Sequence, residues 1–170
     1  GASTGGFESG IELAVRGILV SPSFLFRFED QPTSVEPGTP YRISDLELAS
    51  RLSFFLWGTP PDDELIRIAE AGNLNDVQVL DRQTRRMIAD PRAEALGTRF
   101  ATQWLRLQDL YKVHPDPNFF PNFDQNLADL MATETQMFFN YLVSEDRSFF
   151  EFYNADYSFM NERLARHYGY

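Results

Sequence analysis

The segment from Asp124 to Val143 constrains the fold more than any other part of this sequence, because its apolar residues recur at helical spacing. A stripe of this kind packs one side of a helix into a core and leaves the other side to water. We therefore predict one long helix over this segment. Its predicted core stripe consists of Leu127, Leu130, Met131, Phe138, Tyr141 and Leu142.

Helix start and stop signals divide the rest of the chain into shorter helices. "SDLE" at Ser44 is a capping box with Glu47 as its partner, and Asp90 followed by Pro91 is an N-cap with proline in the first helical position. The other predicted helices cover residues 7–20, 44–57, 60–71, 76–89, 90–107, 148–153 and 159–168, with a short helix in "FLFRFED". We predict an all-α fold, an irregular bundle of about seven to eight helices with no sheet.

The stretch "LASRLSFFLWGTPPDDEL", residues 48–65, is predicted to be a joint between two helices. Its four large apolar residues, Phe54 to Trp57, end the first helix, and we expect them to be buried. Thr59 suits an N-cap and Pro60 the first position of the next helix. The acids at 62–64 then meet the positive end of the helix dipole, so we interpret them as helix-start residues and not as catalysts.

The length and composition predict a single helical domain over residues 1–170. The 43% hydrophobic content, with 16 phenylalanines, supports a real core. Residues 1–6 have the composition of a flexible lead-in. Residues 30–40, "DQPTSVEPGTP", contain three prolines and no periodicity, which predicts an internal surface linker.

The formal net charge of −10 argues against a non-specific nucleic-acid binder and against a protein that binds anionic membranes. The segment from Arg82 to Lys112 departs from this balance, with seven basic and three acidic residues. Fourteen of the fifteen bases in the chain are arginines, which favours planar pairing through several hydrogen bonds. We favour pairing with acids of the same domain. The alternative is a site for an anionic ligand or partner over 82–106.

The chain has no cysteine, which excludes disulfides, thiolate chemistry and covalently attached c-type haem within it. No apolar stretch reaches the length of a membrane span, so we expect no membrane insertion. The first apolar run, Ile11 to Val20, contains Glu12 and Arg16 and is not interpreted as a signal peptide. If the parent protein is exported, its signal lies upstream.

Glu134 is the residue at which chemistry is most expected, because it falls within the apolar stripe of the predicted long helix. An ionised Glu in that position is costly unless it is paired and hydrogen-bonded. Arg51 and Arg99 both neighbour apolar residues of their own predicted helices. We hypothesise that Glu134 pairs with one of them, and we favour a structural ion pair over a catalytic or ligand-binding carboxylate.

The remaining candidates are histidines and aromatic residues. His114, in "KVHPDPNFF", would need further ligands from elsewhere to hold a metal, whereas His167 suits the negative end of the last predicted helix. The loop over 109–123 carries phenylalanines that either cover the core, which we favour, or form an exposed patch. The aromatic binding candidates are Trp57, Trp104, Phe119 and Phe120.

Four stretches together resemble a family of uncharacterised bacterial proteins that is abundant in planctomycetes: "GGFESGIELAVRGILVSPSFLFRFE", "YRISDLELASRLSFFLWGTPPDDEL", "ETQMFFNYLVSEDRSFFEF" and "ADYSFMNERLARHYG". Members are large, exported and built from consecutive domains of unknown function, often alongside a cytochrome-c-type haem domain. The resemblance implies that this chain is an excerpt of a longer multidomain protein, in a periplasmic or otherwise extracytoplasmic location. It also implies haem in a separate domain of the parent protein, with no cofactor in this segment, and it supplies no catalytic residues.

No HExxH, Glu-x-x-His, CxxCH, P-loop, GxSxG or glycine-rich dinucleotide motif occurs. We therefore favour a helical structural or interaction module that packs against neighbouring domains of its chain, a cytochrome domain among them. The alternative is part of a periplasmic redox or polysaccharide-processing enzyme whose active site is completed by segments outside this chain. Enzyme activity is not expected of this segment alone.

Overall fold

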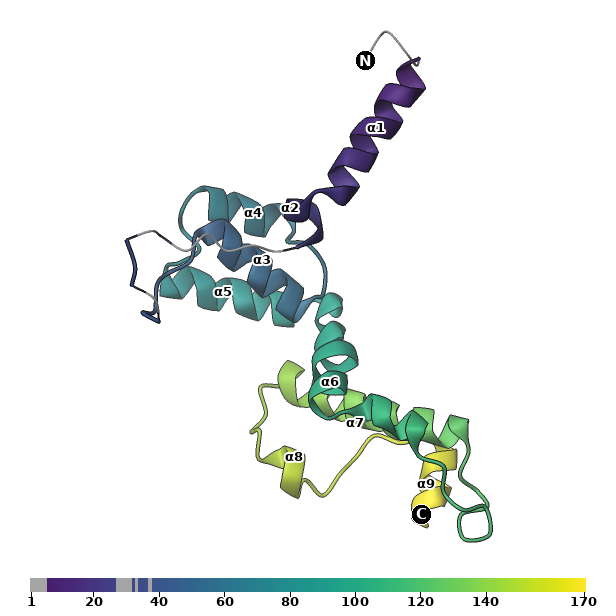
Figure 1. Cartoon of the computed structure of the whole chain (residues 1–170). Helices are drawn as coiled ribbons and strands as arrows, with labels where there is room; N and C mark the ends of the chain where they lie inside the picture. Colours follow the sequence, from purple (N-terminus) through teal and green to yellow (C-terminus); the bar gives the residue numbers. More distant parts are fainter. Residues whose placement is uncertain (1–5, 27–31, 33, 37) are drawn as a thin grey trace. The chain divides into compact units, whose positions relative to one another are not determined.

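A computed structural model describes residues 6–26, 32, 34–36 and 38–170 of the chain (Figure 1). These residues form helices and connecting loops with no strand, as the all-α prediction requires. Nine α-helices occur in the described part of the chain, and three of them (α2, α6 and α8) are no longer than four residues. The chain divides into two compact units, residues 1–43 and 44–170. One domain over 1–170 stays a prediction.

The first unit contains α1 (Phe7–Val20) and α2 (Pro22–Leu25). Ser21 precedes α2 with extended backbone and Pro22 takes the first helical position, as predicted. The short helix predicted in "FLFRFED" ends earlier than expected, because Phe26 is already extended. The predicted lead-in over 1–6 and the predicted linker over 30–40 lie largely or partly outside the described residues.

The second unit begins with α3 (Asp45–Leu56), α4 (Asp63–Glu70) and α5 (Val77–Ile88). The predicted capping box of α3 is present: the Ser44 backbone N–H donates to the Glu47 carboxylate at 2.8 Å, and the Glu47 N–H donates back to the Ser44 hydroxyl at 3.3 Å. Helix α3 packs against both α4 and α5. Their shared core consists of Ala49, Leu56, Trp57, Leu65, Ala69, Leu74, Met87, Ala93 and Leu96.

The joint between α3 and α4 differs from the prediction in two ways. Helix α4 begins at Asp63, and its N-cap is Asp62, whose carboxylate accepts from the Leu65 N–H at 3.0 Å; Thr59 as N-cap was wrong. Asp62 takes the capping role because it also reaches Arg86 of α5, a tertiary contact that the local pattern does not contain. The row Phe54 to Trp57 is not uniformly buried, since Phe55 is 55% exposed.

The helix predicted over 90–107 begins as expected but changes type along its length. Asp90 caps a 3₁₀-helix, η1 (Pro91–Glu94), which is followed by a π-helix, η2 (Leu96–Ala101), and by α6 (Thr102–Trp104). Arg106 then adopts a left-handed conformation (φ 56°), and a 3₁₀-helix, η3 (Leu107–Lys112), follows. A π-helix has a wider turn than an α-helix, so residues after it are rotated about the axis.

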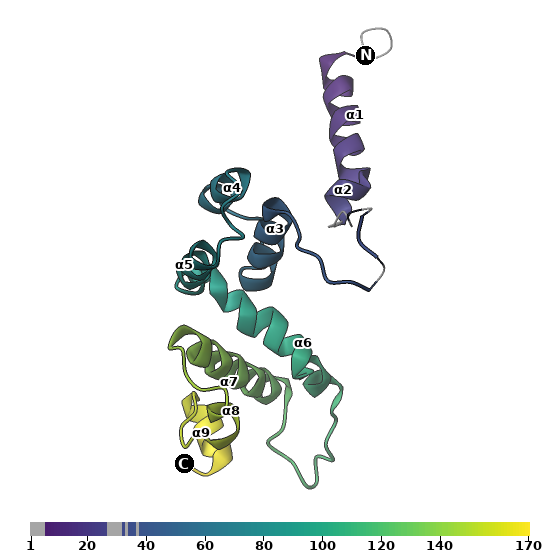
Figure 2. The same ribbon diagram turned by 90° about the vertical axis from the view of Figure 1, so that its left-hand side faces the viewer.

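The predicted long helix is α7 (Gln125–Ser144), capped by Asp124, whose carboxylate accepts from the Leu127 N–H at 2.9 Å. Figures 1 and 2 show α7 beside the segment that contains α6, and α7 has its most extensive contact with η2. Helices α8 (Glu151–Asn154) and α9 (Glu162–Tyr168) follow and pack on α7. Within the predicted stripe, Leu127, Phe138 and Leu142 are buried.

Candidate functional site

A row of exposed aromatic rings crosses the second unit. The ring of Phe55 lies 5.6 Å from that of Phe100, Phe100 lies 6.0 Å from Trp104, and Trp104 lies 5.9 Å from Phe149. We call these four residues the aromatic patch; each is between 41% and 55% exposed. Such distances lie within the range of favourable ring pairs. The patch is therefore an ordered surface and not a set of isolated side chains.

The aromatic patch rests on further rings below it. Phe139 of α7 lies 6.1 Å from Phe100 and 6.4 Å from Trp104, and Phe152 of α8 lies 6.2 Å from Trp104. Phe138 continues the network on the inner side of α7 and is 9% exposed. The support from α7 and α8 fixes the patch, and its outer surface faces solvent.

The π-helix η2 sets the direction of two patch residues. A strict helical stripe of Leu96, Phe100 and Trp104 predicts that all three face the core, but only Leu96 is buried. η2 begins at Leu96, and its wider turn rotates the side chains of Phe100 and Trp104 away from the core. π-Helical turns occur often at functional sites, which makes this departure from the sequence pattern informative.

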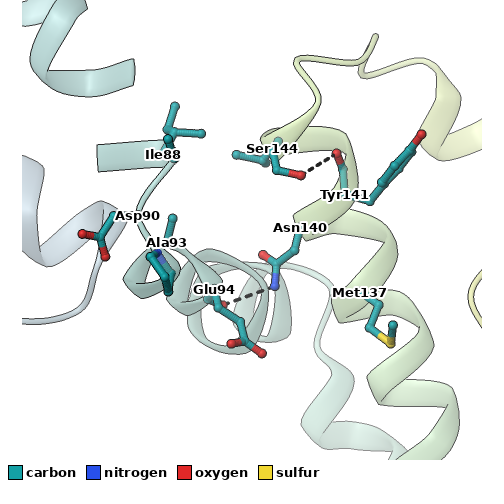
Figure 3. Close-up of a pocket in the computed structure, with 11 residues that line it drawn as sticks. Ile88, Asp90, Ala93, Glu94, Met137, Asn140, Tyr141 and Ser144 are labelled. Atoms are coloured by element: carbon teal, nitrogen blue, oxygen red, sulfur yellow. Dashed lines mark hydrogen bonds between the residues drawn. The ribbon is translucent and has the colours of Figure 1, made fainter. Parts of the chain in front are cut away.

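Gly97 and Asn140 hold the π-helix against α7. The Gly97 N–H donates to the Asn140 side-chain oxygen at 2.9 Å, and the Asn140 amide nitrogen donates to the Glu94 carbonyl at 3.4 Å (Figure 3). A Cβ atom on Gly97 would lie only 2.6 Å from this side chain, so the approach requires glycine. Gln136 donates to the Thr102 hydroxyl at 2.9 Å and adds a second polar link.

A cleft of about 430 Å³ lies between the end of α5, η1 and α7 (Figure 3). Three of its polar side chains are engaged within the protein. Asn140 bonds to backbone on the facing segment, the Ser144 hydroxyl donates to the Tyr141 carbonyl at 3.2 Å, and Asp90 pairs with Arg92. Because Asn140 joins the segment after α5 to α7, we interpret the cleft as a joint between helices.

Glu134 lies on the face of α7 that meets the C-terminal segment. Its carboxylate accepts hydrogen bonds from the hydroxyl groups of Ser158 and Tyr168, the second at 2.7 Å. Burial and this hydrogen bond raise the pKa of Tyr168 to about 12, so the phenol stays a neutral donor. Hydroxyl groups thus stand at Glu134 where an arginine was predicted, and Arg99, one of the two candidates, binds the Gly58 carbonyl instead.

The two arginines lie elsewhere. Arg51 is exposed on α3, and Arg99 donates to the Gly58 carbonyl at 2.8 Å. Gly58 has a φ of +66°, and a Cβ there would lie 2.4 Å from the Arg99 guanidinium. Arg99 therefore closes the joint after α3, and its role is to position backbone.

Trp57 is separated from the aromatic patch and is 2% exposed. Its indole N–H donates to the Met87 carbonyl at 2.8 Å, and the guanidinium carbon of Arg92 lies 3.5 Å from the ring centroid. Arg86 lies 5.6 Å from the same ring and binds the Asp62 carboxylate through two nitrogens, at 2.7 and 3.0 Å. The structure thus places one binding candidate, Trp57, in the core and the other, Trp104, in the patch.

Acids close in space pair with most bases of the basic segment, as the favoured interpretation predicted. Arg86 pairs with Asp62, Arg92 with Asp90, and Arg106 and Lys112 with Asp109; Arg85 pairs with Asp81. The hydrogen bond from Arg86 lowers the pKa of Asp62, and the hydrogen bonds from Arg92 lower the pKa of Asp90 to about 2. Asp62 and Asp81 lie outside the segment and offset part of its positive charge.

The two histidines of the chain line one hollow of about 590 Å³ with the Pro- and Phe-rich loop. Phe119 is 79% and Phe120 58% exposed, so the expectation that these rings cover the core was wrong. In the described part of the chain no three His, Cys, Asp or Glu residues lie close enough together to hold a metal ion. The additional ligands that a site at His114 requires are not found there.

Residues 43–170 match a protein family described as "PSD4: Protein of unknown function (DUF1592)". The match covers well over half of the chain. The chain belongs to the DUF1592 family. The matched region begins within one residue of the second unit, so the aromatic patch and Glu134 both lie in the DUF1592 part.

Neither the curated proteins nor the solved structures contain a match to the chain. The helices of the described residues are each too short or too polar to cross a membrane. The aromatic patch and Glu134 are therefore the candidate functional features of this DUF1592 domain. Phe55 and Phe149 were not predicted to be surface residues, because their spacing from Trp104 carries no local signal.

Proposed function

We propose that this DUF1592 domain is a helical interaction module, and that the aromatic patch binds a neighbouring domain of the same parent protein. The observation that carries the proposal is the solvent exposure of four rings that contact one another in a row. Large exposed patches of apolar side chains mark interaction surfaces, and aromatic residues are enriched in the centres of such surfaces.

The patch has the rigidity that a binding surface needs. Phe139 and Phe152 support Trp104 from below, and the Gly97–Asn140 contact fixes the π-helix that carries Phe100. Because these side chains are already ordered, little conformational entropy is lost when a partner covers them. Trp104, at the centre of the row, is the residue expected to contribute most to binding.

The resemblance to planctomycete-type proteins supplies the rest of the proposal. We infer a large parent protein outside the cytoplasm, with haem in a separate domain and no cofactor held by this segment. A neighbouring domain, such as a cytochrome-type domain, is then the natural occupant of the patch. The segment itself is proposed to be non-catalytic, with its ionisable groups used in helix caps and ion pairs.

The test is the affinity of this chain for the adjoining domain of its parent protein, measured by isothermal titration calorimetry. Replacing Trp104 by Ala should weaken binding by roughly 30-fold or more, the effect of losing a central aromatic anchor. The matched control is Phe119→Ala, which removes an even more exposed ring outside the patch and should change the affinity less than about threefold.

Equal losses in the two variants would contradict a role for the patch. A wild-type chain that binds none of the parent's adjoining domains would contradict the proposal as a whole. Circular dichroism of both variants confirms that each is folded before the affinities are compared.

A further inference from the structure

Two open hollows of about 360 and 700 Å³ meet at Glu134 and share Ala155, Tyr157 and Ser158. We call them together the Glu134 groove. Three carboxylates line it: Glu134 from α7, Glu151 from α8 and Asp156 from the following loop. Every residue that lines the two hollows is described, and none of them is a lysine, an arginine or a histidine.

The charge of Glu134 has no cationic partner in the groove. Both carboxylate oxygens accept from neutral hydroxyls, those of Ser158 and Tyr168, and these bonds hold the group in place without cancelling its charge. Glu151 differs, because it pairs with Arg147 at 3.0 Å in addition to accepting from the Tyr157 hydroxyl at 2.6 Å. The negative potential of the groove therefore centres on Glu134 and Asp156.

Aromatic rings form the walls around these acids. Phe138, Phe152 and Tyr153 line the first hollow, and Tyr170 lines the second. Tyr157 lies between them and contacts Phe138 with ring centroids 5.5 Å apart. The face of an aromatic ring attracts a cation, and a neighbouring carboxylate adds a charge-assisted hydrogen bond.

We propose that the Glu134 groove binds the cationic end of an arginine or lysine side chain from a partner protein. Charge complementarity selects this occupant, because a groove lined by three acids and no base repels phosphates and carboxylates. Its two hollows are open and together exceed the size of one guanidinium, which leaves room for the chain that carries the cation. The groove is distinct from the aromatic patch, and this inference does not rest on the proposed function.

The experiment titrates the ¹⁵N-labelled chain with the blocked tetrapeptide Gly-Arg-Arg-Gly at low ionic strength and follows amide shifts by NMR. The expected shifts concentrate on residues that line the groove. Glu134→Gln should raise Kd about tenfold, because the carboxamide keeps the size of the side chain and removes its charge. Glu151→Gln should have a smaller effect, since Arg147 already offsets that charge.

Glu70→Gln is the matched control, because it makes the same change on an exposed residue of α4 outside the groove. Equal changes in Kd for Glu134→Gln and Glu70→Gln would overturn the inference, since they would show attraction to the net charge of −10 alone. Tetramethylammonium that binds the groove as tightly as the peptide would overturn the assignment to a protein side chain.

Discussion

Two tryptophans mark two different environments in this domain. Trp57 is 2% exposed, its indole N–H has a backbone acceptor, and two arginines lie against its ring. Trp104 is 45% exposed, and its ring lies within 6.4 Å of four other aromatic rings. The helices α3 to α5 around Trp57 form a closed core, whereas η2, α6 and the segment before α8 leave aromatic surface open. The core around Trp57 stabilises the fold, and we assign partner binding to the surface around Trp104.

The largest expected effect separates the two tryptophans directly. Trp57→Ala should lower the free energy of unfolding by about 4 kcal/mol, because it empties a fully buried site. Trp104→Ala should cost about 1 kcal/mol, because much of that ring already faces water. Urea denaturation followed by circular dichroism measures both values. Similar losses would show that the patch belongs to the core.

The next prediction tests the contact between Asp62 and Arg86, the arginine that lies beside the Trp57 ring. Asp62→Asn should cost about 2 to 3 kcal/mol, because the amide keeps the cap of α4 but breaks the charged two-point contact with Arg86. Asp63→Asn serves as the control, as the neighbouring exposed acid in the same helical turn. If the two substitutions cost the same in urea unfolding, the Asp62–Arg86 contact does not stabilise the core.

Acid should weaken this region through the same carboxylate. The hydrogen bond from Arg86 lowers the pKa of Asp62 in the folded state below its ordinary value of 3.8. A depressed pKa stabilises the fold above pH 3.8, and this contribution is lost as the pH falls through the lower, folded-state pKa. Unfolding free energies measured between about pH 5 and about pH 2 should therefore fall less steeply for Asp62→Asn than for wild type. Parallel curves would contradict the linkage.

The last prediction concerns the support of the aromatic patch. Gly97→Ala should cost about 2 kcal/mol, because the added Cβ meets Asn140 at 2.6 Å. The double variant Gly97→Ala with Asn140→Ala removes the clash, so the two losses should not add. Additive losses in a double-mutant cycle would show that this contact does not join η2 to α7.

Local signals predicted the helices that depend on local interactions. The capping box at Ser44 and the apolar spacing of α7 are both contained in consecutive residues, and both are confirmed. The predictions were wrong where a residue far away in the sequence determines the local structure. Asp62 replaces Thr59 as N-cap because it also reaches Arg86, which is 24 residues away in the sequence.

The candidate site was harder to predict for the same reason. The π-helix depends on a contact between Gly97 and Asn140, separated by 43 residues, and it turns Phe100 and Trp104 outward. The predicted ionic partners of Glu134 proved to be hydroxyls 24 and 34 residues away. Residue type identified Glu134 as unusual, but only the fold shows which groups surround it.

The most direct test is hydroxyl-radical footprinting of Trp104 and Trp57, read by mass spectrometry in this chain alone and in the full parent protein. We expect Trp104 to be oxidised readily in the isolated chain and to be protected in the parent protein, where its oxidation rate should approach the low rate of Trp57 in both samples. An oxidation rate of Trp104 that is the same in the two samples would contradict partner binding by the aromatic patch.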